Sequence, residues 1–186
     1  MASSRKKVIL RRINGTSSAT IVPGYLPQSG FVTGSGSAAV LELLDLDGHV
    51  LPIPLREVRM VSFVRDFNPS DRINPERLLR KTFLARPRAE GLQLRITFHD
   101  GDVLEGLAAN DISLLDSAAD DAGLQMAPPD TRSNTQRIYI PRTSIAELVV
   151  VATIGQARPK QAPAAKPTQT VQEGLFDDLP SNSRPN

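Results

Sequence analysis

The sequence predicts a mainly β protein with two tandem five-stranded small barrels, joined by a short helix and followed by a disordered tail. The main observation is a repeat. The segment LPIPLREVRMVSFV at residues 51–64 returns as IYIPRTSIAELVVV at residues 138–151, an offset of 87 residues between Ile53 and Ile140. Glycine turns and apolar runs precede both segments in the same order. Aromatic residues are few, 6 Phe and 2 Tyr, so we expect an aliphatic core.

Residues 1–66 form the first predicted unit. Short runs rich in Val, Ile and Leu alternate with turn signals, of which Asn14-Gly15 is a strong example. Pro23-Gly24 marks a bend within the second run. The last run, EVRMVSFV, alternates only loosely, which is typical of a strand that is buried on both faces for part of its length.

Residues 67–90 are predicted to form a basic linker that contains a short helix. Asn74 is a suitable N-cap, and Pro75 suits the first turn of a helix. Leu79 and Phe83 stand four residues apart, so a helix would place both on one face. We expect this helix to connect the two barrels.

Residues 91–155 form the second predicted unit. The run GLQLRITF alternates apolar and polar residues, which is the pattern of a half-buried strand. Gly101 lies in the turn after this run, and Gly106 bends the next run. The runs RIYIP and SIAELVVVATI close the unit. A unit of about 60 residues buries little apolar surface, so we expect the two units to stabilise each other by packing together.

No group of residues indicates catalysis. The chain has no cysteine, and its two histidines, His49 and His99, lie beside Asp-Gly turns where a polar ring points to water. We therefore expect no enzyme activity, no catalytic residue, no metal site and no cofactor. No run reaches the roughly 20 apolar residues of a membrane span. The sequence predicts a cytoplasmic binding or adaptor protein with a protein partner; whether it forms a homo-oligomer stays open.

Basic residues gather in the linker although the net charge is only +2. The candidates for contact with nucleic acid or a nucleotide are Arg77, Arg80, Lys81, Arg86 and Arg88. The alternative is that this basic stretch is neutralised within the fold by residues 100–130, which contain no Arg or Lys. We favour neutralisation, because surfaces of mixed charge are normal.

The strand order of both units resembles the Sm-like (LSm-type) barrel. That family has a glycine turn, a second glycine five residues later in a bent strand, and a closing hexamer of the form Ile-Arg-Gly-x-x-Ile. Gly101 and Gly106 keep this spacing, and the hexamer frame recurs at residues 53–58 and 140–145. The resemblance implies an Sm/SH3-like fold, with RNA binding as an alternative function. The Arg-Gly pair that helps to hold RNA bases in that family is not kept in either hexamer.

A weaker resemblance is to the PilZ domain, a small β-barrel that binds cyclic di-GMP. It is carried by LRITFHDGDVLEGLAANDISLLDS at residues 94–117, and Asp111-Ile112-Ser113 matches the first half of the PilZ signature. The resemblance implies a cyclic dinucleotide as an alternative ligand, with the arginines of the linker as its contacts.

Residues 156–186 are rich in proline and polar residues and are predicted to be disordered. Within them, VQEGLFDDLP resembles the Gln-x-x-Leu-Phe peptide with which bacterial proteins dock on the replication sliding clamp. Gln172, Leu175 and Phe176 occupy the positions of that peptide. The resemblance implies a partner-docking tail, and the alternative is a chance match of three residues.

Overall fold

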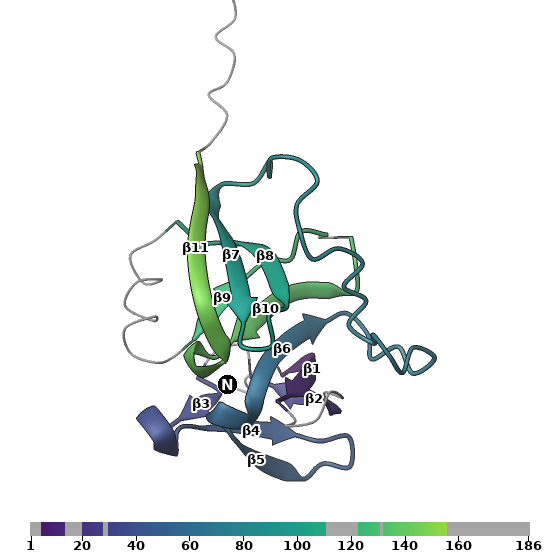
Figure 1. The fold of residues 1–186 in the computed structure, drawn as a ribbon. Helices are drawn as coiled ribbons and strands as arrows, with labels where there is room; N and C mark the ends of the chain where they lie inside the picture. Colours follow the sequence, from purple (N-terminus) through teal and green to yellow (C-terminus); the bar gives the residue numbers. More distant parts are fainter. Residues whose placement is uncertain (1–4, 14–19, 28–29, 111–122, 131, 156–186) are drawn as a thin grey trace, which may run out of the picture. The chain divides into compact units, whose positions relative to one another are not determined.

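The computed structural model describes residues 5–13, 20–27, 30–110, 123–130 and 132–155. All of them belong to one compact unit, which spans residues 1–156. The described chain is mainly antiparallel β, as predicted (Figure 1). The predicted docking residues Gln172, Leu175 and Phe176 lie outside the described residues.

Six strands and two 3-10 turns make up the first half of the fold. They are β1 (Lys6–Arg12), β2 (Ile21–Leu26), β3 (Val32–Thr33), η1 (Gly36–Ala38), β4 (Val40–Leu44), β5 (Val50–Pro54), η2 (Leu55–Glu57) and β6 (Val58–Val64). Strand β1 pairs with both β2 and β6, and β4 pairs with β2, β3 and β5. All of these pairs are antiparallel.

Five strands make up the second half: β7 (Gly91–Phe98), β8 (Val103–Ala108), β9 (Leu124–Met126), β10 (Thr135–Ile140) and β11 (Ile145–Ile154), with the 3-10 turn η3 (Arg142–Ser144) before the last. Strand β7 pairs with β8 and β11, and β9 pairs with β10. A single bridge between Leu107 and Ala127 connects β8 to the residue after β9. The pairings of β1, β2, β4, β5 and β6 therefore recur, in the same order, among β7 to β11.

The segments that repeat in the sequence have the same backbone. In each, a strand leads to a proline, a 3-10 turn comes after the proline, and the next strand then begins. Pro54 has φ −55° and ψ 130°, and Pro141 has φ −59° and ψ 144°. The strands β6 and β11 also bulge at equivalent positions, since Arg59 and Ala146 are each skipped in the register with the neighbouring strand. A fixed proline φ suits the entry to both turns.

The two halves are joined by an antiparallel pair of β6 and β10 (Figure 1). In its register, Tyr139 lies opposite Val61, Ile138 opposite Ser62, and Arg137 opposite Phe63. The result is an eight-stranded sheet that crosses both halves and a three-stranded sheet of β11, β7 and β8. Among the described residues, the pairings close neither sheet into a barrel, because β6 takes its second partner from the other half.

Two apolar clusters form the core, and each takes one large residue from the opposite half. The first cluster gathers residues of β1 to β6 together with Tyr139 of β10. The second gathers residues of β7 to β11 together with Met60 of β6. The Tyr139 ring packs edge-on against Phe31, with centroids 5.0 Å apart. Both clusters are largely aliphatic, as predicted.

The predicted linker helix is wrong: residues 67–90, the connecting segment, are all described and contain no helix. One turn starts where expected, since the Arg77 N–H donates to the Asn74 carbonyl at 2.8 Å. Arg77 then has φ 49°, a left-handed conformation that cannot continue a right-handed helix. Leu79 is 73% exposed, so Leu79 and Phe83 do not form one buried face.

The connecting segment is held by hydrogen bonds to the second half, and these bonds replace the hydrogen bonds of a helix. The Thr135 hydroxyl donates to the Glu76 carbonyl at 2.7 Å, and the Asn134 side chain donates to the Pro75 carbonyl at 2.8 Å. Further along, the Phe83 N–H donates to the Glu105 carboxylate at 2.9 Å. A short isolated helix is only marginally stable, so these tertiary bonds decide the conformation.

Candidate functional site

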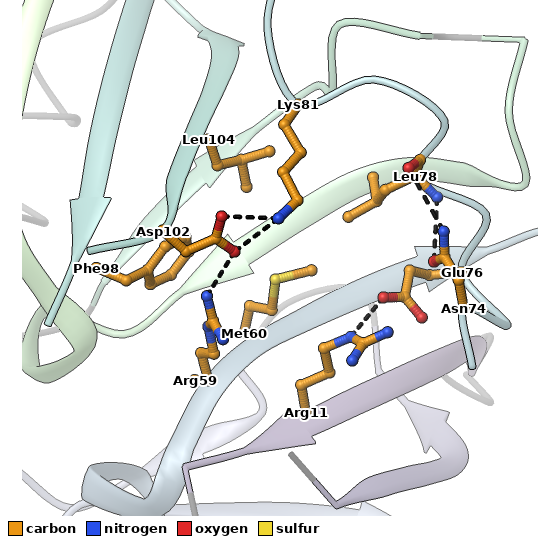
Figure 2. A pocket seen from close by; sticks show the side chains of 10 residues that line it. All are labelled: Arg11, Arg59, Met60, Asn74, Glu76, Leu78, Lys81, Phe98, Asp102 and Leu104. Carbon is orange, nitrogen blue, oxygen red and sulfur yellow. Dashed lines mark hydrogen bonds and ion pairs between the residues drawn. The ribbon is translucent and has the colours of Figure 1, made fainter. Parts of the chain in front are cut away.

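A small cavity with a mixed lining of charged and apolar side chains lies where the connecting segment meets both halves (Figure 2). Its volume is about 160 Å³. The lining side chains come from β1, β6, the connecting segment and the β7–β8 hairpin: Arg11, Arg59, Met60, Asn74, Glu76, Leu78, Lys81, Phe98, Asp102 and Leu104. The cavity is therefore built from residues that are distant in the sequence.

The charged side chains around the cavity neutralise one another. Figure 2 shows Lys81 and Arg59 converging on the Asp102 carboxylate, at 2.7 Å and 2.8 Å. Arg59 also pairs with Asp100 at 2.7 Å, and its guanidinium lies 4.6 Å from the centre of the Phe98 ring. On the other side, Arg11 pairs with Glu76. Each pair joins two different segments, so the cluster ties the halves to the connecting segment.

Two carboxylates near the cavity have lowered pKa values. Partial burial raises the pKa of Asp102, but the hydrogen bond from Lys81 and the charges of Lys81 and Arg59 outweigh it. Burial likewise opposes ionisation of Glu105, but hydrogen bonds from the Phe83 backbone and from Arg95 bring its pKa below the usual range. Both carboxylates are therefore held ionised by their neighbours.

Two residues that line the cavity each carry a buried polar atom with no hydrogen-bond partner within the described structure: Glu76 Oε2 and Arg59 Nε. The carboxylate oxygen is an acceptor and the guanidinium N–H is a donor, so an ordered water would satisfy either atom. The cavity is smaller than the roughly 300–1,000 Å³ of a typical small-molecule site. Its geometry fits a structural junction better than a substrate pocket.

The predicted basic residues are not brought together at this cavity. Lys81 lines the cavity, and Asp102 binds its ammonium group. Arg77 donates to the Asn68 side chain at 2.9 Å. Arg80, Arg86 and Arg88 are exposed along the connecting segment. The PilZ-like residues Asp111 to Ser113 lie outside the described residues.

The carboxylates of two aspartates beside the turns accept hydrogen bonds from the backbone. The Asp45 carboxylate accepts hydrogen bonds from the backbone N–H groups of Asp47 and His49. Asp100 accepts from the N–H of Asp102 in the turn between β7 and β8. Within the described ranges, no three His, Cys, Asp or Glu residues are placed to hold a metal ion. In the same part of the chain, no helix has the length and apolar character needed to cross a bilayer.

The most unusual surface is the outer edge of β11. In the described chain this strand pairs only with β7, and its other edge is open. Large apolar side chains line it: Leu148, Val149, Val150 and Val151, all exposed. Soluble proteins usually protect such an edge with charges, prolines or covering elements. The sequence showed the apolar run, but did not show which edge would remain unpaired.

A family model described as a family of unknown function (DUF6982) matches residues 4–152. The match covers both halves and the connecting segment, and it ends just before the last residues of β11. No curated protein and no solved structure matches the chain.

Proposed function

The chain belongs to the DUF6982 family, whose function is unknown, and we propose that it is a non-enzymatic cytoplasmic adaptor that binds proteins through the open edge of β11. Its lack of cysteine suits a reducing compartment. The observation that carries the proposal is the exposed apolar row from Leu148 to Val151 on that edge. A strand added there gains backbone hydrogen bonds, and the apolar side chains supply the contact area.

The proposal includes the finer fold that the sequence suggests, two tandem Sm/SH3-like five-stranded units. Its support is the recurrence of strand pairings in the two halves and the equal backbone of the two proline-containing turns. In such an arrangement, β6 of the first half pairs with a strand of the second half. The equivalent strand of the second half, β11, remains available to pair with a partner.

Partner capture from an extract of the source cells tests the proposal. The bait is the tagged full chain, compared with Val149→Glu, which places a charge on the open edge. Leu84→Glu is the control, because Leu84 is 76% exposed and lies in the connecting segment. We expect Val149→Glu to lose a partner that the control keeps, and the purified partner to reproduce the difference. Equal binding by both variants would overturn the role of the edge.

The tail supplies a separate arm of the same experiment. Gln172, Leu175 and Phe176 are proposed as a second docking element, on their resemblance to the sliding-clamp peptide. A chain that lacks residues 170–180 should lose binding to the purified clamp. If recovery is unchanged, the tail has no part in the function.

Binding of a polyanion is the second candidate, favoured by the exposed Arg80, Arg86 and Arg88. A fluorescent oligouridine and cyclic di-GMP are suitable probes for the RNA and cyclic dinucleotide alternatives. Binding that depends on phosphate contacts weakens steeply with salt. We expect the triple change of these arginines to Ala to abolish low-salt binding. No binding of either probe by the unmodified chain at low salt would exclude this candidate.

A further inference from the structure

We infer that copies of this chain join head to tail, with the open edge of β11 in one copy pairing with the open edge of β5 in the next. This inference rests on the proposed function, since it names the partner of the β11 edge. The partner is a second copy of the same chain, and the contact repeats one that already exists inside each copy.

The β6–β10 pair is the template for this contact. It joins the last strand of the first half to the penultimate strand of the second half. An offset of 87 residues relates β6 to β11 and β10 to β5, as shown by the matching turns and bulges. Strand β11 is therefore the equivalent of β6, and β5 is the equivalent of β10. A pair between β11 and β5 would have the same geometry as the β6–β10 pair.

Both equivalent edges are open. Strand β11 pairs only with β7, and β5 pairs only with β4, within the described part of the chain. One molecule therefore carries one open edge of each kind. The described strands β5 and β11 do not pair with each other within one molecule, so neighbouring copies can supply the missing strand at each edge.

The open edges of β11 and β5 carry exposed apolar side chains at the positions whose equivalents in β6 and β10 are buried. In β6, Val61 and Phe63 are 0% and 4% exposed, whereas their equivalents Leu148 and Val150 in β11 are 40% and 57% exposed. In β10, Ile138 is fully buried, whereas its equivalent Leu51 in β5 is 37% exposed. Pairing β11 with β5 would remove this apolar surface from water.

The template also gives the register. In the internal pair, Arg137 faces Phe63, Ile138 faces Ser62 and Tyr139 faces Val61. Adding or subtracting the repeat offset of 87 places Val50 opposite Val150, Leu51 opposite Val149, and Pro52 opposite Leu148. Every residue in these three predicted pairs is apolar.

Two differences make the contact between copies weaker than the internal one. Pro52 has no N–H to donate at the position that Tyr139 fills in β10. Ser144, which bonds to Val58 across the internal contact, is replaced at the equivalent position by Glu57, which pairs with Arg12. We therefore expect assembly that depends on concentration. Because the contact uses two different surfaces, it produces a ring or an open filament.

Sedimentation velocity of the full chain, from micromolar to millimolar concentration, tests the assembly. We expect a mass above the 20.2 kDa of one chain that increases with concentration. Val150→Glu and Val50→Glu should each return the chain to a monomer, because each removes one of the two edges. Leu84→Glu is the control and should assemble normally. Circular dichroism verifies that the variants remain folded.

A disulfide tests the register, since the chain has no cysteine of its own. Directly opposed residues of antiparallel strands have Cα atoms about 4.5 or 5.5 Å apart, which a disulfide can span. The double variant Val50→Cys/Val150→Cys should form covalent oligomers on mild oxidation. The single variants should each remain mostly uncrosslinked, although an equal mixture of the two should form crosslinked dimers.

The failures of the inference and of the proposed function are distinguishable. A chain that stays monomeric at every concentration overturns the inference, as does assembly that survives Val50→Glu. Loss of assembly with Val150→Glu alone would mean that β11 pairs with another β11. In each of these cases, a different protein that binds the unmodified chain and not Val149→Glu would still support the adaptor function.

Discussion

Ser144 Oγ donates a hydrogen bond of 2.9 Å to the backbone carbonyl oxygen of Val58, 86 residues away in the sequence. Val58 begins β6 directly after the turn η2, and Ser144 ends the turn η3. The two equivalent turns of the fold therefore contact each other at the end of the β6–β10 pair. Both residues are buried, so water does not compete for this bond.

Ser144→Ala should destabilise the protein, because the Val58 carbonyl would lose its buried donor. We expect a loss of about 1–3 kcal/mol in the free energy of unfolding, measured by urea denaturation. Ser70→Ala is the matched control, since the Ser70 hydroxyl bonds to Asn68 at the surface, and its effect should stay within about 0.5 kcal/mol. Equal stability of the two variants would show that the bond between the turns contributes little.

Gly24→Ala should also destabilise the protein, because the bent strand β2 passes close to β4. A Cβ atom at Gly24 would lie 2.6 Å from the Leu44 carbonyl oxygen and 2.8 Å from the Leu43 side chain. The backbone must shift to accept it, at a cost of about 1–3 kcal/mol. Gly155→Ala is the control, since nothing lies within 4 Å of a Cβ there. A thermal melt in which both variants match the unmodified chain would contradict this close approach.

The folded protein should lose stability in acid, because protonation of Asp102 removes its ion pairs. Its pKa in the folded protein is below the ordinary value of 3.8, so its ion pairs stabilise the fold fully above that value. The contribution is lost as the pH falls from about 4 through the lower pKa of the folded state. Asp102→Asn should therefore be less stable at neutral pH and should show a shallower loss below about pH 4.

Urea denaturation at several pH values between about 2 and 7 measures this difference. Glu90→Gln, at an exposed position of the connecting segment, is the control. If Asp102→Asn and the unmodified chain lose stability in parallel between about pH 4 and 2, the pairs with Lys81 and Arg59 do not stabilise the fold.

Tyr139 should ionise unusually late. Burial raises its pKa to about 12, because the charged phenolate is poorly solvated between β9 and β6. The chain has 2 tyrosines, so in the variant Tyr25→Phe only Tyr139 remains. The absorbance of Tyr139 at alkaline pH can then be followed alone. The unfolded chain ionises near 10, so stability should be lost as the pH increases from about 10 to 12. A midpoint near 10 in the folded variant would contradict the burial of Tyr139.

Much of the local structure was predictable from the sequence. The alternation in GLQLRITF became strand β7, and the turn glycine Gly101 has the positive φ, 80°, that its position requires. The conformation of the connecting segment was not predictable in this way. Asn74 does begin a turn, but hydrogen bonds from Asn134 and Thr135, about 60 residues away, decide the path of the chain after it.

For the candidate surfaces too, the sequence showed the residue types, whereas only the structure showed their partners and exposure. The basic residues of the connecting segment were visible in the sequence, but the pairing of Lys81 with Asp102 was not. The apolar run from Leu148 to Val151 was also visible, whereas its exposure depends on β11 having a single neighbour.

The sequence by itself determined where strands and turns occur and that two segments share one backbone, because these features depend on side-chain periodicity and on glycine and proline, which act locally. Only the tertiary structure decided that β6 pairs with β10 and that β11 and β5 keep open edges. Any strand of suitable pattern can accept a neighbour on either edge, so the choice of neighbour depends on the packing of the whole chain.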